Sequence, residues 1–141
     1  MKTTNLEISK KLKKIGFEAE TFFFWTKAPK LTELDKDRYV IALANKADFS
    51  EEEQMYPAYH LETLIEALPS VIEREGSGNN IYFKMNKNRV WYENSCNCDS
   101  SEYCPVNIYY RIDRQKNESL ADTAGKMLIK LFEAGIINFK K

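Results

Sequence analysis

The segment IYFKMNKNRVWY, residues 81–92, predicts a β-hairpin and decides the fold class. Ile81–Met85 and Val90–Tyr92 are rich in aromatic and β-branched residues, which favour strands. The intervening NKNR carries two asparagines, a residue type that tolerates the left-handed backbone angles of turns. Further along, residues 106–112 (VNIYYRI) alternate well enough for a half-buried strand. The second half of the chain therefore predicts an antiparallel sheet.

Two segments nearer the N-terminus also predict strands. Thr21–Trp25 (TFFFW) is β-branched and aromatic throughout, and the following KAPK breaks it. Tyr39–Leu43 (YVIAL) is a second strand candidate, although the alanines at 42 and 44 leave a helix open.

A helix is predicted at the N-terminus. Thr4 and Glu7 have the spacing of a capping box. Ile8, Leu12 and Ile15 then form one apolar stripe at helical spacing, and lysines fill the other face. The glycine at 16 is typical of the residue that ends a helix.

Two more helices are predicted, one central and one C-terminal. The central helix lies between Pro57 and Pro69 and has leucines and isoleucine at helical spacing. The last helix follows Ser119 and Asp122, which are spaced as a capping pair, and ends at Gly135. Together these segments predict an α+β fold, a mainly antiparallel β-sheet packed with about three α-helices. The linker-like GSGNN at 76–80 is too short to divide the chain, so we expect residues 1–141 to form a single domain.

Charge is balanced over the whole chain and unevenly distributed along it. The 21 basic and 21 acidic residues cancel, whereas a strongly basic excess is typical of nucleic-acid-binding proteins. Residues 1–16 carry five lysines and one acid, and residues 48–75 carry eight acids and one arginine. We interpret both runs as solvated surface, with a bipolar molecule that orients its partners as the alternative.

Hydrophobicity and cysteine content indicate the compartment. No stretch approaches the roughly 20 apolar residues of a membrane span, so no membrane partner is expected. The first residues lack the apolar run of a signal peptide. Three cysteines are an odd number and too few for a disulfide-built secreted domain. We therefore expect a cytoplasmic protein, in a bacterial host if the chain comes from a phage.

Three segments, about a third of the chain, resemble a family of small uncharacterised proteins of phages, prophages and bacterial mobile elements. They are Ser9–Trp25 (SKKLKKIGFEAETFFFW), Tyr56–Ser70 (YPAYHLETLIEALPS) and Ser119–Ile137 (SLADTAGKMLIKLFEAGII). The pattern departs at His60, where that family usually has a helix-capping threonine. The resemblance implies this type of fold and an origin in a mobile element, and it implies no catalytic residue because the family has no established activity.

The cysteines give a metal-site hypothesis. Cys96, Cys98 and Cys104 form C-x-C-x5-C in a predicted loop, and thiolates are favoured ligands of structural zinc. A structural zinc ion usually takes four ligands, so His60, the only histidine, or Asp99 would have to supply the fourth. The alternative is free thiols in a polar loop, or a disulfide formed after purification.

The sequence favours a non-enzymatic protein over an enzyme. A histidine-dependent catalytic pair is possible through His60 alone, and no G-x-S-x-G nucleophile motif accompanies it. Gly76 and Gly78 lack the lysine of a phosphate-binding loop. The glutamates at 51–53 form an exposed run, whereas acid–base catalysis needs two carboxylates held in a cleft.

Aromatic and basic residues occur together on the predicted strands of the second half. The candidate binding residues are Lys84, Arg89, Trp91, Tyr109 and Arg111. Sheets that bind single-stranded nucleic acid stack bases on exposed aromatic rings and place cations beside the backbone. The alternative is that another helix covers the outward face of the sheet, or that the tyrosines lie on a solvent-exposed sheet without a binding role.

The sequence therefore leaves three functions open, in order of preference. The first is a non-catalytic interaction or accessory module that binds a protein partner or a second copy of itself, since Tyr and Trp are enriched at interfaces. The second is a protein that binds single-stranded nucleic acid through the aromatic strands. The third is a small zinc-binding protein.

Overall fold

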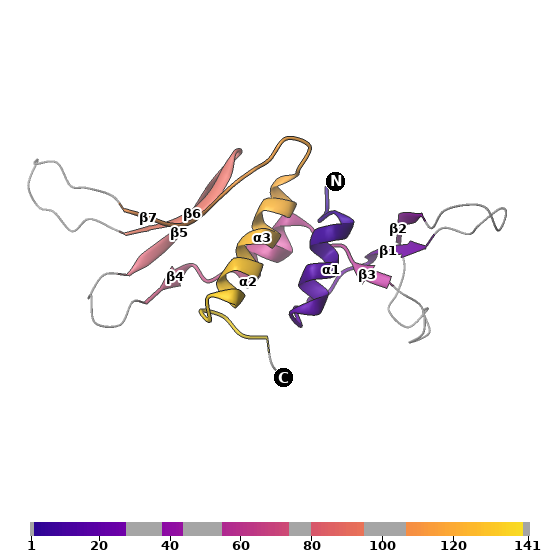
Figure 1. Cartoon of the computed structure of the whole chain (residues 1–141), viewed down its shortest axis with the longest axis horizontal. Helices are drawn as coiled ribbons and strands as arrows, with labels where there is room; N and C mark the ends of the chain where they lie inside the picture. Colours follow the sequence, from indigo (N-terminus) through magenta and orange to yellow (C-terminus); the bar gives the residue numbers. More distant parts are fainter. Residues whose placement is uncertain (1, 28–37, 44–54, 74–79, 95–106, 140–141) are drawn as a thin grey trace, which may run out of the picture.

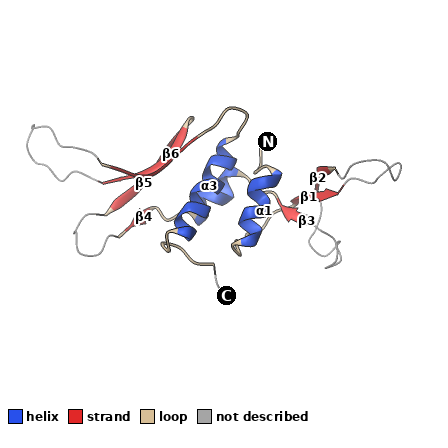
Figure 2. Cartoon of the chain, viewed as in Figure 1, coloured by secondary structure: helices blue, strands red, loops and turns tan. Residues whose placement is uncertain are grey.

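The computed structural model describes residues 2–27, 38–43, 55–73, 80–94 and 107–139. In this part of the chain, three helices lie between two antiparallel sheets, so the predicted α+β fold is confirmed (Figures 1 and 2). The helices are α1 (Leu6–Lys14), α2 (Leu61–Ala67) and α3 (Leu120–Glu133). The three-stranded sheet has the order β2 (Tyr39–Leu43), β1 (Phe23–Lys27), β3 (Met55–Pro57). The four-stranded sheet has the order β4 (Val71–Ile72), β5 (Ile81–Asn86), β6 (Arg89–Asn94), β7 (Ile108–Asp113).

Helix α3 lies at the centre of the core. It contacts α1 and α2 as well as β6 and β7. Its side chains Ala124, Met127, Leu128 and Leu131 are almost completely buried. Among the contacts described, α3 alone packs on both other helices and on the four-stranded sheet. It therefore determines which face of that sheet is covered.

Helices α1 and α3 approach closely at Gly125. A Cβ atom at this position would lie 2.6 Å from Cγ2 of Ile8, which is closer than carbon atoms can pack. The predicted apolar stripe of α1 explains the contact, because Ile8 and Leu12 are both buried against the core. Gly125 is therefore needed for space, although a glycine inside a helix is otherwise unfavourable.

The N-terminal cap of α1 differs from the prediction. Asn5, not Thr4, is the capping residue, and its side chain accepts a hydrogen bond from the Ile8 backbone N–H at 2.8 Å. Thr4 is buried instead, where its hydroxyl lies 2.7 Å from that of Ser9 and accepts from the Tyr59 backbone N–H. The long-range hydrogen bond with Tyr59 holds Thr4 in the core, so its neighbour Asn5 caps the helix.

The other predicted helix ends agree with the structure. Ser119 and Asp122 form a complete capping box at the start of α3. Gly16 and Gly135 follow α1 and α3 with φ angles of +90° and +76°, in the left-handed region that favours glycine. In the described residues, no helix has the length and apolar character needed to cross a membrane.

The predicted hairpin of the second half is present as β5 and β6. Its turn is Lys87–Asn88, and the Asn86 side chain accepts hydrogen bonds from the backbone N–H groups of Asn88 and Arg89 at 2.8 and 3.0 Å. The asparagine that predicted the turn therefore stabilises it directly. The strand prediction for 39–43 is also confirmed, whereas the short strands β3 and β4 were not predicted.

Candidate binding face on the four-stranded sheet

The two faces of the four-stranded sheet differ in their neighbours. One face packs on α3 and buries Ile81, Val90 and Tyr92. Because successive side chains of a strand point to opposite faces, the residues between these lie on the other side. We call this side the outer face, and in the described residues no helix lies on it (Figure 1).

The strand register arranges the outer face in three rows that run across the strands. The first row is Val71, Tyr82, Glu93 and Ile108, and the third is Asn86, Arg89 and Asp113. The second row is Lys84 and Trp91, continued on β7 by Arg111, which lies opposite Trp91 together with the bulged Tyr110 at the register shift. A tryptophan thus lies at the centre of the face with a cation on each side. Four of the five candidate binding residues predicted from the sequence meet here.

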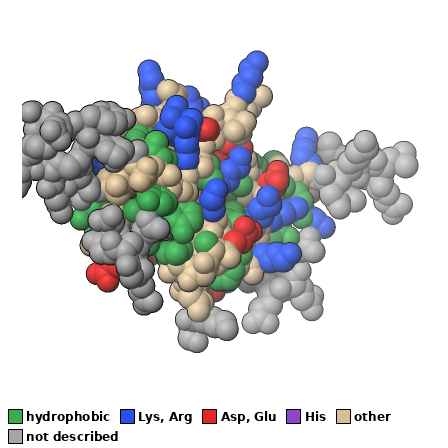
Figure 3. Space-filling view, turned by 60° about the vertical axis from the view of Figure 1, so that its left-hand side comes forward, with side chains coloured by type: hydrophobic (Ala, Val, Ile, Leu, Met, Phe, Trp, Pro, Cys, Tyr) green, Lys and Arg blue, Asp and Glu red, His purple; other side chains and the backbone are tan. Residues whose placement is uncertain are grey.

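The apolar part of the outer face is exposed in the first row. Val71 and Ile108 are 39% and 49% exposed, and they lie at opposite edges of the sheet. Figure 3, in which the end of the molecule that carries the four-stranded sheet comes forward, shows hydrophobic side chains at the surface with Lys and Arg side chains beside them. Tyr82 and Glu93 lie between these two residues in the row, so Val71 and Ile108 are single exposed apolar groups at the edges of the face.

Hydrogen bonds within the face fix its aromatic and basic side chains. The indole N–H of Trp91 donates to the Glu93 carboxylate at 3.1 Å. Arg111 Nε donates to Asp113 at 2.9 Å, and Arg89 Nε lies 3.5 Å from the same oxygen. The Arg111 guanidinium beside Asp113 lowers the pKa of that carboxyl. The face therefore presents three cations (Lys84, Arg89 and Arg111) and two carboxylates (Glu93 and Asp113). Of these described residues, all except Lys84 have a partner on the face.

Tyr109, the fifth candidate, lies on the inner face. It is paired with buried Tyr92 and packs against the core, as does its neighbour Tyr110. Tyr110 has φ +52°, and the strand register shifts between Val90 and Tyr92. This bulge breaks the alternation, so two consecutive tyrosines face inward and Arg111 is returned to the outer face.

The predicted metal ligands are not brought together in the described residues. Cys96, Cys98 and Cys104 lie outside them, as does Asp99, so the zinc site stays a prediction. His60 precedes α2 and packs edge-on against Phe23, with ring centroids 4.9 Å apart. Its Nδ1 is buried without a hydrogen-bond partner. Among the described side chains no group of three metal-ligating residues occurs.

Replacing His60 by threonine is expected to stabilise the protein. His60 occupies the N-cap position of α2 but its side chain caps no backbone N–H. A threonine hydroxyl there can accept from the first turn, and a good N-cap contributes about 1 kcal/mol. We expect His60→Thr to raise the free energy of unfolding by about that amount in urea denaturation. The His60→Ala variant, which has no capping group, is the control, and equal stability of the two variants would contradict the prediction.

Some residues of the outer face carried no signal in the sequence. Val71 belongs to a two-residue strand, which is too short for periodicity to reveal. Glu93 could have been found by extending the alternation outward from Trp91. Alternation from Arg111 would have placed Ile108 on the inner face, because the bulge at Tyr110 shifts the register between them.

Comparisons of the chain with protein-family models, with curated proteins and with solved structures find no match. The geometry of the outer face is therefore the basis for its functional assignment.

Proposed function

We propose that this chain is a non-catalytic protein-interaction module and that the outer face is its binding surface. The observation that carries the proposal is the row Lys84, Trp91, Arg111 in the middle of a sheet face that no described helix covers. Trp, Tyr and Arg are the residue types most enriched among the strongest contacts of protein interfaces. Val71 and Ile108 add exposed apolar area at the two edges.

The charges of the outer face favour a protein partner over single-stranded nucleic acid. A surface that binds phosphates needs cations without competing carboxylates, because counterion release drives the binding. Here Asp113 holds Arg89 and Arg111, and Glu93 holds the indole N–H of Trp91. Mixed charges around an aromatic centre instead match the polar rim and apolar centre of protein interfaces.

We propose a second copy of the chain as the partner at the outer face. Most homo-oligomers are two-fold dimers in which one patch meets itself, so the patch must complement itself. A two-fold axis parallel to the rows would place the first row of each copy over the third row of the other. Glu93 of one copy would then face Arg89 of the other, and Trp91 would lie near the axis. Sheets that pack face to face in this way are about 10 Å apart.

Light scattering during size-exclusion chromatography tests this function. We expect the wild-type chain to show twice the mass of one chain at high concentration, and Trp91→Ala to show the mass of one chain. Phe22→Ala is the matched control, because Phe22 is also an exposed aromatic residue, at 54%, but lies outside the outer face. A wild-type protein that stays monomeric at every concentration would contradict self-association.

The same samples distinguish the nucleic-acid alternative. If the wild-type chain is monomeric and binds a single-stranded oligonucleotide more tightly as salt falls, phosphate contacts carry the binding. Dependence of that binding on Trp91 would assign the outer face to nucleic acid in place of protein. The origin implied by the sequence resemblance fits either result, as an accessory protein of a mobile element in the cytoplasm of its host.

A further inference from the structure

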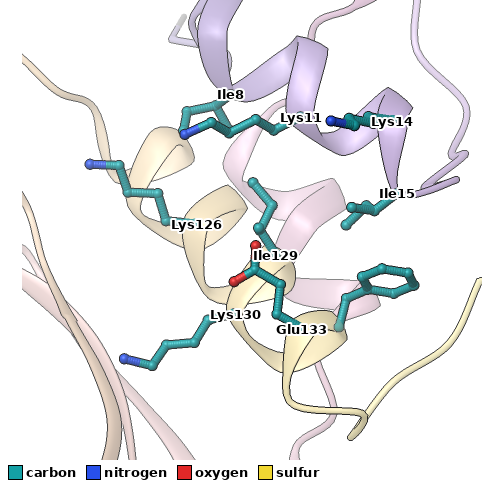
Figure 4. A pocket seen from close by; sticks show the side chains of 9 residues that line it. Ile8, Lys11, Lys14, Ile15, Lys126, Ile129, Lys130 and Glu133 are labelled. Atoms are coloured by element: carbon teal, nitrogen blue, oxygen red, sulfur yellow. The ribbon is translucent and has the colours of Figure 1, made fainter.

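A groove of about 790 Å³ lies between α1 and α3, away from the outer face. Its apolar floor is formed by Ile8 and Ile15 of α1 and by Ile129 and Phe132 of α3. Ile15 and Ile129 extend into the space between the two helices (Figure 4). Ile8 is buried, whereas Ile15, Ile129 and Phe132 are only partly covered.

Lysines from both helices form the rim of this groove. They are Lys11 and Lys14 on α1, and Lys126 and Lys130 on α3. Figure 4 shows Lys126 and Lys130 on one side, extending away from the isoleucines. Among the described residues that line the groove, Glu133 alone is acidic. The groove therefore combines an apolar floor with a positively charged rim.

Within the described part of the chain, two of these lysines have no ion-pair partner. Lys11 forms an exposed ion pair with Glu7 at 3.4 Å, and Lys126 pairs with Glu118. Lys14 and Lys130 form no ion pair with any described residue. An occupant that carries carboxylates on both sides would neutralise the rim, and complementary charge directs association toward such a partner.

We infer that this groove docks an acidic amphipathic helix of a partner protein. Four of the five lining residues of α3 (126, 129, 130 and 133) follow helical spacing, with Phe132 beside them, so the groove has the ridges and gaps into which another helix packs. A helix laid along the groove would place its apolar stripe on the isoleucines and its acidic flanks beside the lysines. Nucleic acid is disfavoured, because the sugar–phosphate backbone gains nothing from an apolar floor.

This inference is independent of self-association, because the groove and the outer face share no residue. A dimer formed through the outer faces would present two such grooves.

Selection from a displayed library of amphipathic helical peptides tests the inference. The library keeps an apolar stripe and varies the flanking positions, in peptides of the length of α3, 14 residues, or about 21 Å of helix. We expect selection on the wild-type chain to enrich Asp and Glu at the flanks. Selection of peptides with neutral or basic flanks would overturn the inference.

Charge reversal in the groove provides the second readout. Lys14→Glu with Lys130→Glu is expected to weaken the selected acidic peptides by about tenfold or more in fluorescence anisotropy, because like charges then face each other. Lys2→Glu with Lys116→Glu is the control, because it changes the net charge equally at exposed positions that do not line the groove. Salt screens charges at that distance, so this control should bind the peptides within about twofold of the wild-type affinity. Equal losses in the two variants, or none in either, would overturn the inference. Circular dichroism confirms that each variant is folded. Anionic vesicles or an oligonucleotide that displace the peptide equally from the wild type and from the control variant would also count against a helix.

Discussion

Gly125→Ala is expected to destabilise the protein, although alanine is the better helix former by about 1 kcal/mol. The new Cβ atom would lie 2.6 Å from Cγ2 of Ile8, whereas Thr4 and Leu12 would be in ordinary van der Waals contact with it at 3.4 and 3.5 Å. Overpacking of this kind typically costs about 1–3 kcal/mol, because α1 must move or side chains must leave their rotamers. We therefore expect a net decrease in the free energy of unfolding, measured by urea denaturation.

A double-mutant cycle with Ile8→Ala identifies the cause of that loss. Ile8→Ala alone leaves a cavity and is expected to cost about 2–5 kcal/mol. In the double variant the alanine methyl at 125 occupies part of that cavity. The double variant should therefore lose less free energy of unfolding than the sum of the two single losses. Additive losses, or a Gly125→Ala variant more stable than the wild type, would show that α1 does not pack on Gly125.

The stability of the fold is expected to fall steeply in alkaline solution because of two buried tyrosines. Burial raises the pKa of Tyr59 from about 10 to about 12, and burial also raises the pKa of Tyr92. The folded chain therefore favours the neutral phenols, while the unfolded chain ionises them near pH 10. Their contribution to stability is complete below pH 10 and is lost as the pH rises toward 12.

Ultraviolet absorbance of phenolate, followed together with circular dichroism, measures this effect. We expect these two tyrosines to ionise as the chain unfolds and not before. Tyr92→Phe, which also loses the hydrogen bond from the Tyr92 hydroxyl to the Pro69 carbonyl, should be less stable at neutral pH but lose less stability between pH 10 and 12. Full ionisation of all tyrosines near pH 10 with the helices intact would contradict the burial of these two side chains.

The local elements could be predicted from the sequence where short-range physics decides them. The hairpin turn at Asn86, the capping box at Ser119 and the glycine ends of α1 and α3 all depend on neighbours in the chain. The outer positions of Lys84, Trp91 and Arg111 were also predictable in part, because alternation separates them from buried neighbours.

The remaining features depend on contacts between distant residues. Thr4 and Asn5 are both good capping residues, and the bond between Thr4 and Tyr59 decides between them. The bulge at Tyr110 turns Tyr109 inward, and no local pattern marks it. The division of the strands into two sheets follows from how they pack around the helices, which periodicity does not contain.

The groove between α1 and α3 likewise could not be predicted from the sequence. The lysines of α1 formed a solvated helix face in the sequence interpretation. In the structure these lysines line a groove, because α3 places Lys126 and Lys130 beside them from more than 100 residues away in the chain. Two amphipathic faces that lie side by side in space thus form a surface that neither helix shows alone.

A mixing experiment tests the central claim, that the outer face binds a second copy through complementary charges. Arg89→Glu and Glu93→Arg each place like charges opposite each other in the proposed dimer, so each variant alone is expected to sediment as a single chain. An equimolar mixture restores both pairs and is expected to sediment as a dimer in analytical ultracentrifugation. If the wild-type chain dimerises but both variants dimerise alone as well, or if the mixture stays monomeric, the proposed arrangement of the outer faces is wrong.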